Sequence, residues 1–116
     1  MTDAPRVSGA LAAHYAPRTP LIVVTGEMLR AEVQAMRAAG FSSVVLGFDG
    51  APDPVTKFIA MPRTATGYAQ RLYAALREAD AADADRILIE QPPPGTGWLA
   101  IHDRLTRAAA GSLRRG

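Results

Sequence analysis

Two glycine-containing loops hold the residue types in this sequence best suited to ligand chemistry. Residues 95–100 read GTGWLA and fit the pattern G-x-G-x-x-G/A, in which glycines let a pyrophosphate approach the N-terminus of the following helix. Residues 25–26, Thr-Gly, lie where a short apolar run meets a helix-like segment, and ligands of open α/β sheets bind at such junctions. The candidate ligand-binding residues are Gly26, Gly95, Thr96 and Gly97.

Each loop also has a simpler explanation. Three prolines separate residues 95–100 from the preceding apolar run, whereas the dinucleotide fingerprint needs a tight strand-to-helix turn. The fingerprint also expects an acidic residue about 20 positions later, and the sequence ends first. Glu27 would repel an anion bound beside Gly26, although its charge complements the helix dipole. A plain capped loop and a small-ligand or nucleotide-binding loop both stay open.

Other catalytic chemistry finds little support in the residue types. The sequence has no cysteine, which excludes disulfides, zinc–thiolate sites and thiol nucleophiles. Its two histidines, His14 and His102, are accompanied by no G-x-S-x-G motif and by no metal-ligand spacing. We interpret His102 as part of a helix surface on which Asp103 and Arg107 form an i,i+4 ion pair.

Two groups of charged residues have an ordinary structural interpretation. Three aspartates follow the second long helical pattern: Asp80, Asp83 and Asp85. They lack the glycine and the later glutamate of a calcium loop, so we interpret them as a solvated helix end and turn. Four arginines lie near the C-terminus: Arg104, Arg107, Arg114 and Arg115. An RNA-binding accessory module is the alternative for these, although no aromatic residues are interleaved for base stacking.

The composition indicates one globular domain. The chain has 116 residues, 48% of them apolar and 21% charged, with a formal net charge of +2. These values argue against disorder and give weak support for nucleic-acid binding. No apolar run approaches the roughly 20 residues of a membrane helix, and the first residues lack the pattern of a signal peptide. We therefore expect a soluble cytoplasmic protein with no membrane partner.

The apolar pattern predicts strands that alternate with helices. Strands are predicted at residues 21–24, 43–48, 57–61 and 87–89, the third at a sheet edge. Helices are predicted at residues 27–39, from Thr64 or Thr66 through the apolar stripe at 69–76, and at 98–110. The predicted fold class is α/β: a small Rossmann-like three-layer sandwich, with a mostly parallel sheet of 3–5 strands and helices on both faces.

The predicted domain is flanked by two short segments. Residues 1–20 contain three prolines and a glycine among small residues, which predicts an extended arm or interdomain linker. Residues 21–111 form the predicted α/β domain. Gly111 is expected to end the last helix, which leaves residues 112–116 as a frayed tail.

Three motifs give the sequence a family resemblance. Residues 14–20 read HYAPRTP and resemble the linker of long-form threonylcarbamoyl-AMP synthases, which reads P-G-x-x-x-x-H-Y-A-P-x-x-P; Ser8 stands here in place of the first proline. Residues 68–80 resemble the Y-A-x-x-L-Y-x-x-L-R-x-x-D helix of the family's C-terminal domain. Residues 100–108 resemble its terminal helix. The likeness extends from about Ser8 to Gly111.

The resemblance implies an accessory role. In these enzymes a YrdC-like catalytic domain binds ATP, magnesium and threonine and makes threonylcarbamoyl-AMP, which modifies a tRNA adenosine. No part of this sequence resembles that domain, so no residue here inherits a catalytic role, and neither a cofactor nor a metal is expected on this chain. His14, Tyr15 and Pro17 match the linker that lies over the catalytic pocket, which implies a lid. The expected partners are the catalytic domain, tRNA-modification proteins and a second copy of the chain.

Overall fold

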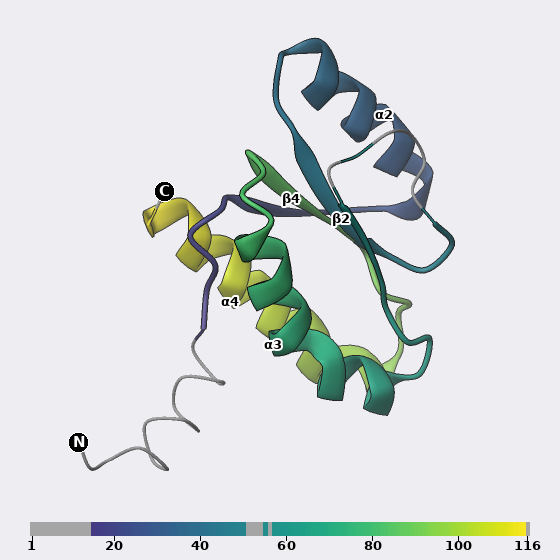
Figure 1. The fold of residues 1–116 in the computed structure, drawn as a ribbon. Coiled ribbons are helices and arrows are strands. Elements are labelled where there is room, and N and C mark those ends of the chain that lie inside the picture. The colour runs from purple at the N-terminus through teal and green to yellow at the C-terminus, as the bar shows by residue number, and fades with distance from the viewer. Residues whose placement is uncertain (1–14, 51–54, 56, 116) are drawn as a thin grey trace, which may run out of the picture.

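The protein is described by a computed structural model that covers residues 15–50, 55 and 57–115, with side chains described as far as Leu113. Its elements in chain order are β1 (Leu21–Val24), α2 (Gly26–Ala38), β2 (Ser43–Gly47), β3 (Lys57–Ala60), α3 (Ala65–Ala81), β4 (Arg86–Glu90), the short 3-10 helix η1 (Thr96–Trp98) and α4 (Leu99–Arg115). Figure 1 shows their arrangement. Every predicted strand and helix is present, and most ends differ by one or two residues from the prediction.

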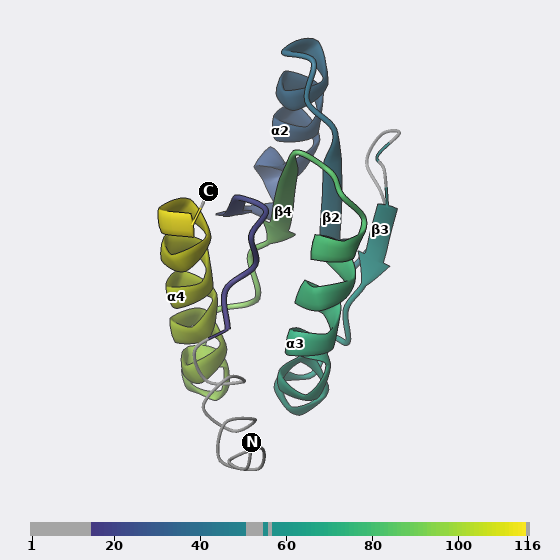
Figure 2. The same cartoon turned by 60° about the vertical axis from the view of Figure 1, so that its left-hand side comes forward.

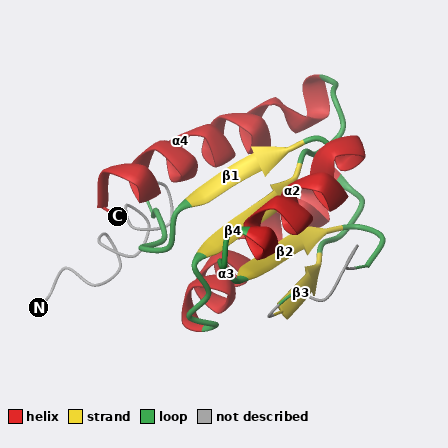
Figure 3. Cartoon of the chain, turned by 90° about the horizontal axis from the view of Figure 1, so that it is seen from above, coloured by secondary structure: helices red, strands yellow, loops and turns green. Residues whose placement is uncertain are grey.

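The four strands form one parallel sheet in the order β1-β4-β2-β3. They lie side by side in this order in Figure 3. β3 is an edge strand, as predicted, and β4 is inserted between β1 and β2. Figure 1 shows α2 on one side of the sheet and α3 and α4 on the other. The predicted Rossmann-like three-layer sandwich is therefore confirmed.

Each face of the sheet has its own apolar cluster. Leu29 and Val33 of α2 pack with Val45 and Leu88 on one face. The larger cluster lies under α3 and α4 on the other face, where Val44, Leu46, Ile87 and Ile89 meet side chains such as Leu72, Leu76 and Leu105. Because successive strand residues point to opposite faces, a strand covered on both sides must be apolar throughout. This explains the continuous apolar runs at 44–46 and 87–89.

Local signals fix where the helices begin and end. The side chain of Thr25 accepts a hydrogen bond from the Met28 amide at 3.3 Å, which caps α2. Of the two predicted caps of α3, Thr64 is the one used, since its hydroxyl accepts from the Gly67 amide at 3.1 Å. Gly40, just after α2, has a φ of +88°, the left-handed conformation expected of a glycine at this position.

The predicted end of the last helix is wrong. α4 does not stop at Ala110 but continues through Gly111 to Arg115. Ser112, assigned to the tail in the sequence-based prediction, is fully buried. Its hydroxyl donates to the Ala109 carbonyl at 2.8 Å and accepts from the Leu21 amide at 3.0 Å. The last turns of α4 are therefore tied to the start of β1.

Candidate functional site

The described part of the predicted arm lies between α3 and α4. Residues 15–20, called here the docked linker, contain no helix or strand, and Figure 2 shows them passing between the two helices. On the α3 side, the ring of Tyr15 meets Tyr73 edge-on with centroids 6.5 Å apart. On the α4 side, a Cβ placed on Gly111 would lie 2.6 Å from the Cβ of Ala16. Glycine at 111 thus allows the linker to cross the helix at close range.

Asp80, in the last turn of α3, binds the docked linker through its carboxylate. It accepts hydrogen bonds from the Thr19 hydroxyl at 2.7 Å, the Thr19 amide at 3.0 Å and the Arg18 amide at 3.1 Å. The Tyr15 hydroxyl donates a longer bond of 3.4 Å. Burial by itself would raise the pKa of Asp80, but the bonds from Thr19, Arg18 and Tyr15 outweigh it and hold that pKa below its ordinary value.

Sequence reasoning interpreted Asp80 as solvated and so missed this contact. A signal was available in the charge pattern of α3. A carboxylate in the last turn of a helix faces the negative end of the helix dipole, and that turn contains no basic residue. An acid at such a position is stabilised when it accepts hydrogen bonds from another segment.

The two other aspartates of the group line the same hollow of about 350 Å³ as Asp80, but they do not bind the docked linker in the way that Asp80 does. Asp85 accepts bonds from the Ser42 amide at 2.8 Å and the Ser42 hydroxyl at 3.1 Å, and returns one from its own amide to that hydroxyl. The bond from the Ser42 amide is the main reason why the pKa of Asp85 lies below its ordinary value. Asp83 has a φ of +60° just after α3. Asp85 thus joins the turn before β4 to the residue before β2, and Asp83 forms part of the turn after α3.

A hollow of about 280 Å³ lies at the opposite end of the sheet, where β1, β2 and β4 end. Its lining residues are Gly26, Glu27, Leu29, Arg30, Asp49, Gly50 and Glu90. This is the edge at which α/β folds bind ligands, and Gly26 lies there as the sequence predicted. Asp49 and Glu90 were not singled out from the sequence. The available signal was an acid directly after each of two apolar runs.

The carboxylate of Glu90 fits into space left by two glycines. Its Oε1 accepts a bond from the Phe48 amide at 3.1 Å. A Cβ on Gly26 would lie 2.9 Å from Oε2, and one on Gly47 would lie 2.9 Å from Oε1.

Burial, with a smaller contribution from the Glu90 charge, raises the pKa of Tyr68 well above its usual range. The Tyr68 hydroxyl finds no hydrogen-bond partner among the described residues.

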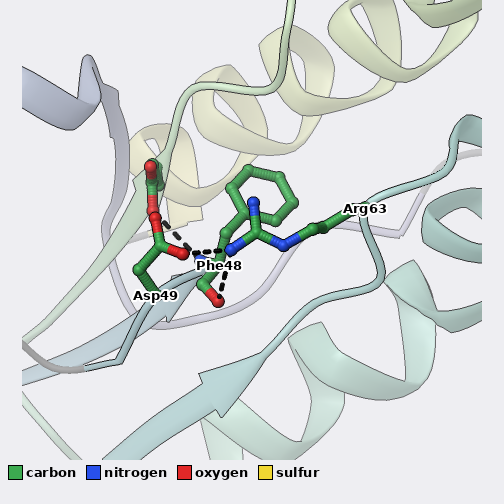
Figure 4. A network of polar contacts seen from close by, with 4 residues as sticks. Phe48, Asp49 and Arg63 are labelled. Carbon is green, nitrogen blue, oxygen red and sulfur yellow. Dashed lines mark hydrogen bonds and ion pairs between the residues drawn. The ribbon is translucent and has the colours of Figure 1, made fainter.

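One carboxylate of the hollow is already paired. Figure 4 shows the guanidinium of Arg63 reaching the Asp49 carboxylate and the Phe48 carbonyl. The same guanidinium carbon lies 5.7 Å from the centroid of the Phe48 ring, within cation–π range. Arg63 therefore links the start of α3 to the loop after β2 and neutralises one acid of the lining.

The second predicted ligand loop does not join this hollow. Gly95, Thr96 and Gly97 are exposed and are not among its lining residues. A Cβ on Gly97 would meet nothing within 4 Å, so no close approach requires a glycine there. The ring of His102 donates from Nε2 to the Pro93 carbonyl at 2.9 Å, which fastens the proline segment to α4. This histidine has a structural contact, as does the predicted Asp103–Arg107 pair, confirmed at 2.9 Å.

Comparison with known families places the chain. The model of the family described as "Threonylcarbamoyl-AMP synthase, C-terminal domain" matches residues 1–110. The chain belongs to this family. The resemblance predicted from the linker and helix motifs is therefore confirmed, and this C-terminal domain is an accessory domain.

Solved structures agree with the family in fold. A P. abyssi Sua5 structure with alanine in place of a histidine and the adjacent tyrosine is 22% identical, with a TM-score of 0.73 over 83% of this chain and 29% of that one. P. abyssi Sua5 complexed with L-threonine is 24% identical, with a TM-score of 0.75 over 86% of this chain and 31% of that one. The chain thus spans under a third of these proteins. No curated protein sequence matches it.

Proposed function

We propose that this C-terminal domain carries the linker that covers the active site of a YrdC-like catalytic domain of threonylcarbamoyl-AMP synthase. The observation that supports the proposal is the docked linker, which Asp80 holds between α3 and α4. A cover that is held firmly at one end is presented in a defined direction, and lids of this kind exclude water and complete an active site.

The three expected lid residues divide between two roles. Pro17 is buried against its own domain, so we assign it to docking. Tyr15 is half-buried beside Tyr73 and lies at the outer end of the docked linker, and His14 precedes it just outside the described residues. We therefore assign His14 and Tyr15 to the catalytic pocket. In one P. abyssi Sua5 structure an adjacent histidine and tyrosine are replaced by alanine, and this supports the choice of the His14–Tyr15 pair for mutation.

The proposed reaction joins threonine, bicarbonate and ATP into threonylcarbamoyl-AMP and releases pyrophosphate. The product hydrolyses readily, so exclusion of water would preserve it. We assign ATP and Mg²⁺ to the catalytic domain. Among the described residues no three histidines or acids gather closely enough to hold a metal ion, and no step is assigned to Mg²⁺ here.

Localisation and partners follow from the same proposal. No helix within the described ranges is long and apolar enough to cross a membrane. We place the reaction in the cytoplasm with its tRNA-modification partners, in cis or in trans with the catalytic domain. A second copy of the chain remains a proposed partner.

An assay of the synthase reaction tests the proposal. The chain is incubated with ATP, threonine and bicarbonate alone, and then with the catalytic domain added or fused before Met1. We expect no pyrophosphate from the chain alone. With the catalytic domain, we expect more threonylcarbamoyl-AMP per ATP consumed, and a loss of this gain in His14→Ala and Tyr15→Ala. Pyrophosphate release by the chain alone, or an equal yield with and without it, would contradict the proposal.

The hollow at the other end of the sheet favours a second, weaker candidate: a small-ligand or nucleotide-binding module. Its position is the one expected for such a ligand, but two of its lining acids, Glu27 and Glu90, repel phosphate groups. The third acid, Asp49, is paired with Arg63, and Arg30 adds one positive charge to the lining. An NMR titration with nucleotides to millimolar concentration tests this candidate. Shifts of the Gly26 and Gly50 amide signals would support binding, and unchanged spectra would exclude the nucleotide-binding function.

A further inference from the structure

The docked linker is held by two helices at once. α3 supplies the Asp80 carboxylate and the Tyr73 ring, and α4 supplies the flat surface at Gly111 against which Ala16 packs. The hold continues into the sheet, because the Leu21 amide donates to the buried Ser112 hydroxyl at 3.0 Å. The chain is therefore in contact with α3 or α4 at short intervals between residue 15 and the start of β1.

We propose that Asp80 is a positioning residue that makes residues 15–19 a rigid part of this domain. The linker and the domain then move relative to the catalytic pocket as one body. This inference rests on the proposed function of the linker as a cover, but the docking itself is testable without a catalytic domain.

The kind of bond that Asp80 accepts supports rigidity. Two of its donors are backbone amides, those of Arg18 and Thr19. A backbone donor cannot rotate away as a side chain can, so these bonds fix the path of the chain. Pro17 between them and Tyr15 has a restricted φ and is buried. A hinge in this stretch would have to break several charge-assisted bonds together.

Docking of the linker stabilises the charged form of the Asp80 carboxylate. The carboxylate stands in the last turn of α3, which has no basic residue, and there the helix dipole disfavours a negative charge. The linker amides supply the opposite partial charge. Release of the linker would leave Asp80 without these donors, so docking is favoured whenever Asp80 is ionised.

Backbone ¹⁵N relaxation and amide exchange on the whole chain test the inference. In the unmodified chain we expect Arg18 and Thr19 to have order parameters close to those of α3 and α4, about 0.85. In Asp80→Ala we expect values below about 0.6 and exchange of these amides at least about tenfold faster, while α3 and α4 keep their values. Asp80→Asn keeps one acceptor oxygen and should restore part of the order.

Two further variants separate the loss of linker docking from a general effect of mutation on folding. Asp103→Ala removes an exposed carboxylate from α4 and should leave the linker ordered. Gly111→Ala adds a methyl group that would meet Ala16 at 2.6 Å, so it should loosen residues 15–17 from the other side with Asp80 intact. Low order parameters at Arg18 and Thr19 in the unmodified chain, or unchanged ones in Asp80→Ala, would overturn the inference.

The synthase assay then separates the inference from the proposed function. If Asp80→Ala frees the linker and lowers the yield of threonylcarbamoyl-AMP per ATP, with partial rescue by Asp80→Asn, both hold. If the linker is freed and the yield is unchanged, Asp80 still positions the linker but the linker is not a cover. If the unmodified linker is already loose yet its His14 and Tyr15 variants lose yield, the cover stands and the rigid-body inference fails.

Discussion

The two ends of the sheet differ in how their acids are used. At the amino end, Asp80 accepts four hydrogen bonds and Asp85 accepts two, in each case from another segment of the chain. At the carboxyl end, Glu27, Asp49 and Glu90 line an open hollow of about 280 Å³. Ligands of α/β sheets are expected at the carboxyl end. Here the denser set of polar contacts lies at the other end, and what it binds is the chain's own linker.

The difference shows how an accessory domain can keep a ligand-binding fold for another purpose. Helices that return antiparallel to the strands bring their C-terminal ends to the amino end of the sheet, where α3 and α4 flank the incoming chain (Figure 2). The first strand then begins between these helix ends. The same connectivity that creates the hollow therefore creates a place to hold whatever precedes β1.

The largest expected effect is at the amino end. Asp80→Ala removes the acceptor of four hydrogen bonds, so we expect the free energy of unfolding to fall by about 2 kcal/mol. Urea denaturation measures it. Asp103→Ala, which breaks an exposed i,i+4 pair, should cost no more than about 0.5 kcal/mol. Equal losses in the two variants would remove the distinction between a docking acid and a surface acid.

A smaller effect is expected at the carboxyl end, where two glycines can be compared. A Cβ on Gly47 would lie 2.9 Å from Glu90 Oε1 and 3.2 Å from the Phe58 ring, so Gly47→Ala should lower the unfolding free energy by about 1–2 kcal/mol. At Gly26 only the Glu90 side chain is close. It can move, and alanine favours the helix, so Gly26→Ala should be nearly neutral. Thermal unfolding of both variants gives the comparison, and the reverse order would contradict the arrangement.

The smallest effects distinguish two tyrosines. The Tyr68 hydroxyl is buried with no hydrogen-bond partner in the described part of the chain, so Tyr68→Phe should leave the unfolding free energy unchanged or raise it by up to about 1 kcal/mol. Tyr15→Phe removes the 3.4 Å bond to Asp80 and should lower it by about 0.5 kcal/mol. A large loss in Tyr68→Phe would mean that its hydroxyl has a partner after all.

The parts of the fold that follow from local pattern could be predicted. The runs at 44–46 and 87–89 are apolar on both faces and predicted the buried strands. The start of α3 was narrowed to Thr64 or Thr66, of which Thr64 is the cap. The Asp103–Arg107 pair follows from helical spacing alone. The helix cap and the ion pair depend on residues that lie within a few positions in sequence. The buried strands depend only on being covered on both faces.

The parts that depend on distant segments could not be predicted. Gly111 has the local appearance of a helix end, and only the approach of Ala16 shows why it lies inside α4. The donors to Asp80 lie 61 to 65 positions away in sequence. Glu90 was overlooked because the glycines that make room for it lie far away in sequence, Gly26 at the start of α2 and Gly47 at the end of β2. Family resemblance identified the linker but said nothing of what holds it.

The most direct test of the central claim is an NMR titration of the Arg18 and Thr19 amides, whose shifts follow the ionisation of the carboxylate that they donate to. The charged and titratable groups around Asp80 are Tyr15, Arg18, Tyr73, Asp83 and Asp85. Because the folded-state pKa of Asp80 is lowered, its bonds stabilise docking above the ordinary aspartate range and are lost as the pH falls through the lowered value.

We predict that both amides shift in one step with a midpoint below about 3.9, the usual aspartate value, that the linker loses part of its order in that same step, and that Asp80→Asn abolishes the step. A midpoint at or above the usual value, or a linker whose order is unchanged after Asp80 is protonated, would contradict the claim that this carboxylate holds the linker on the domain.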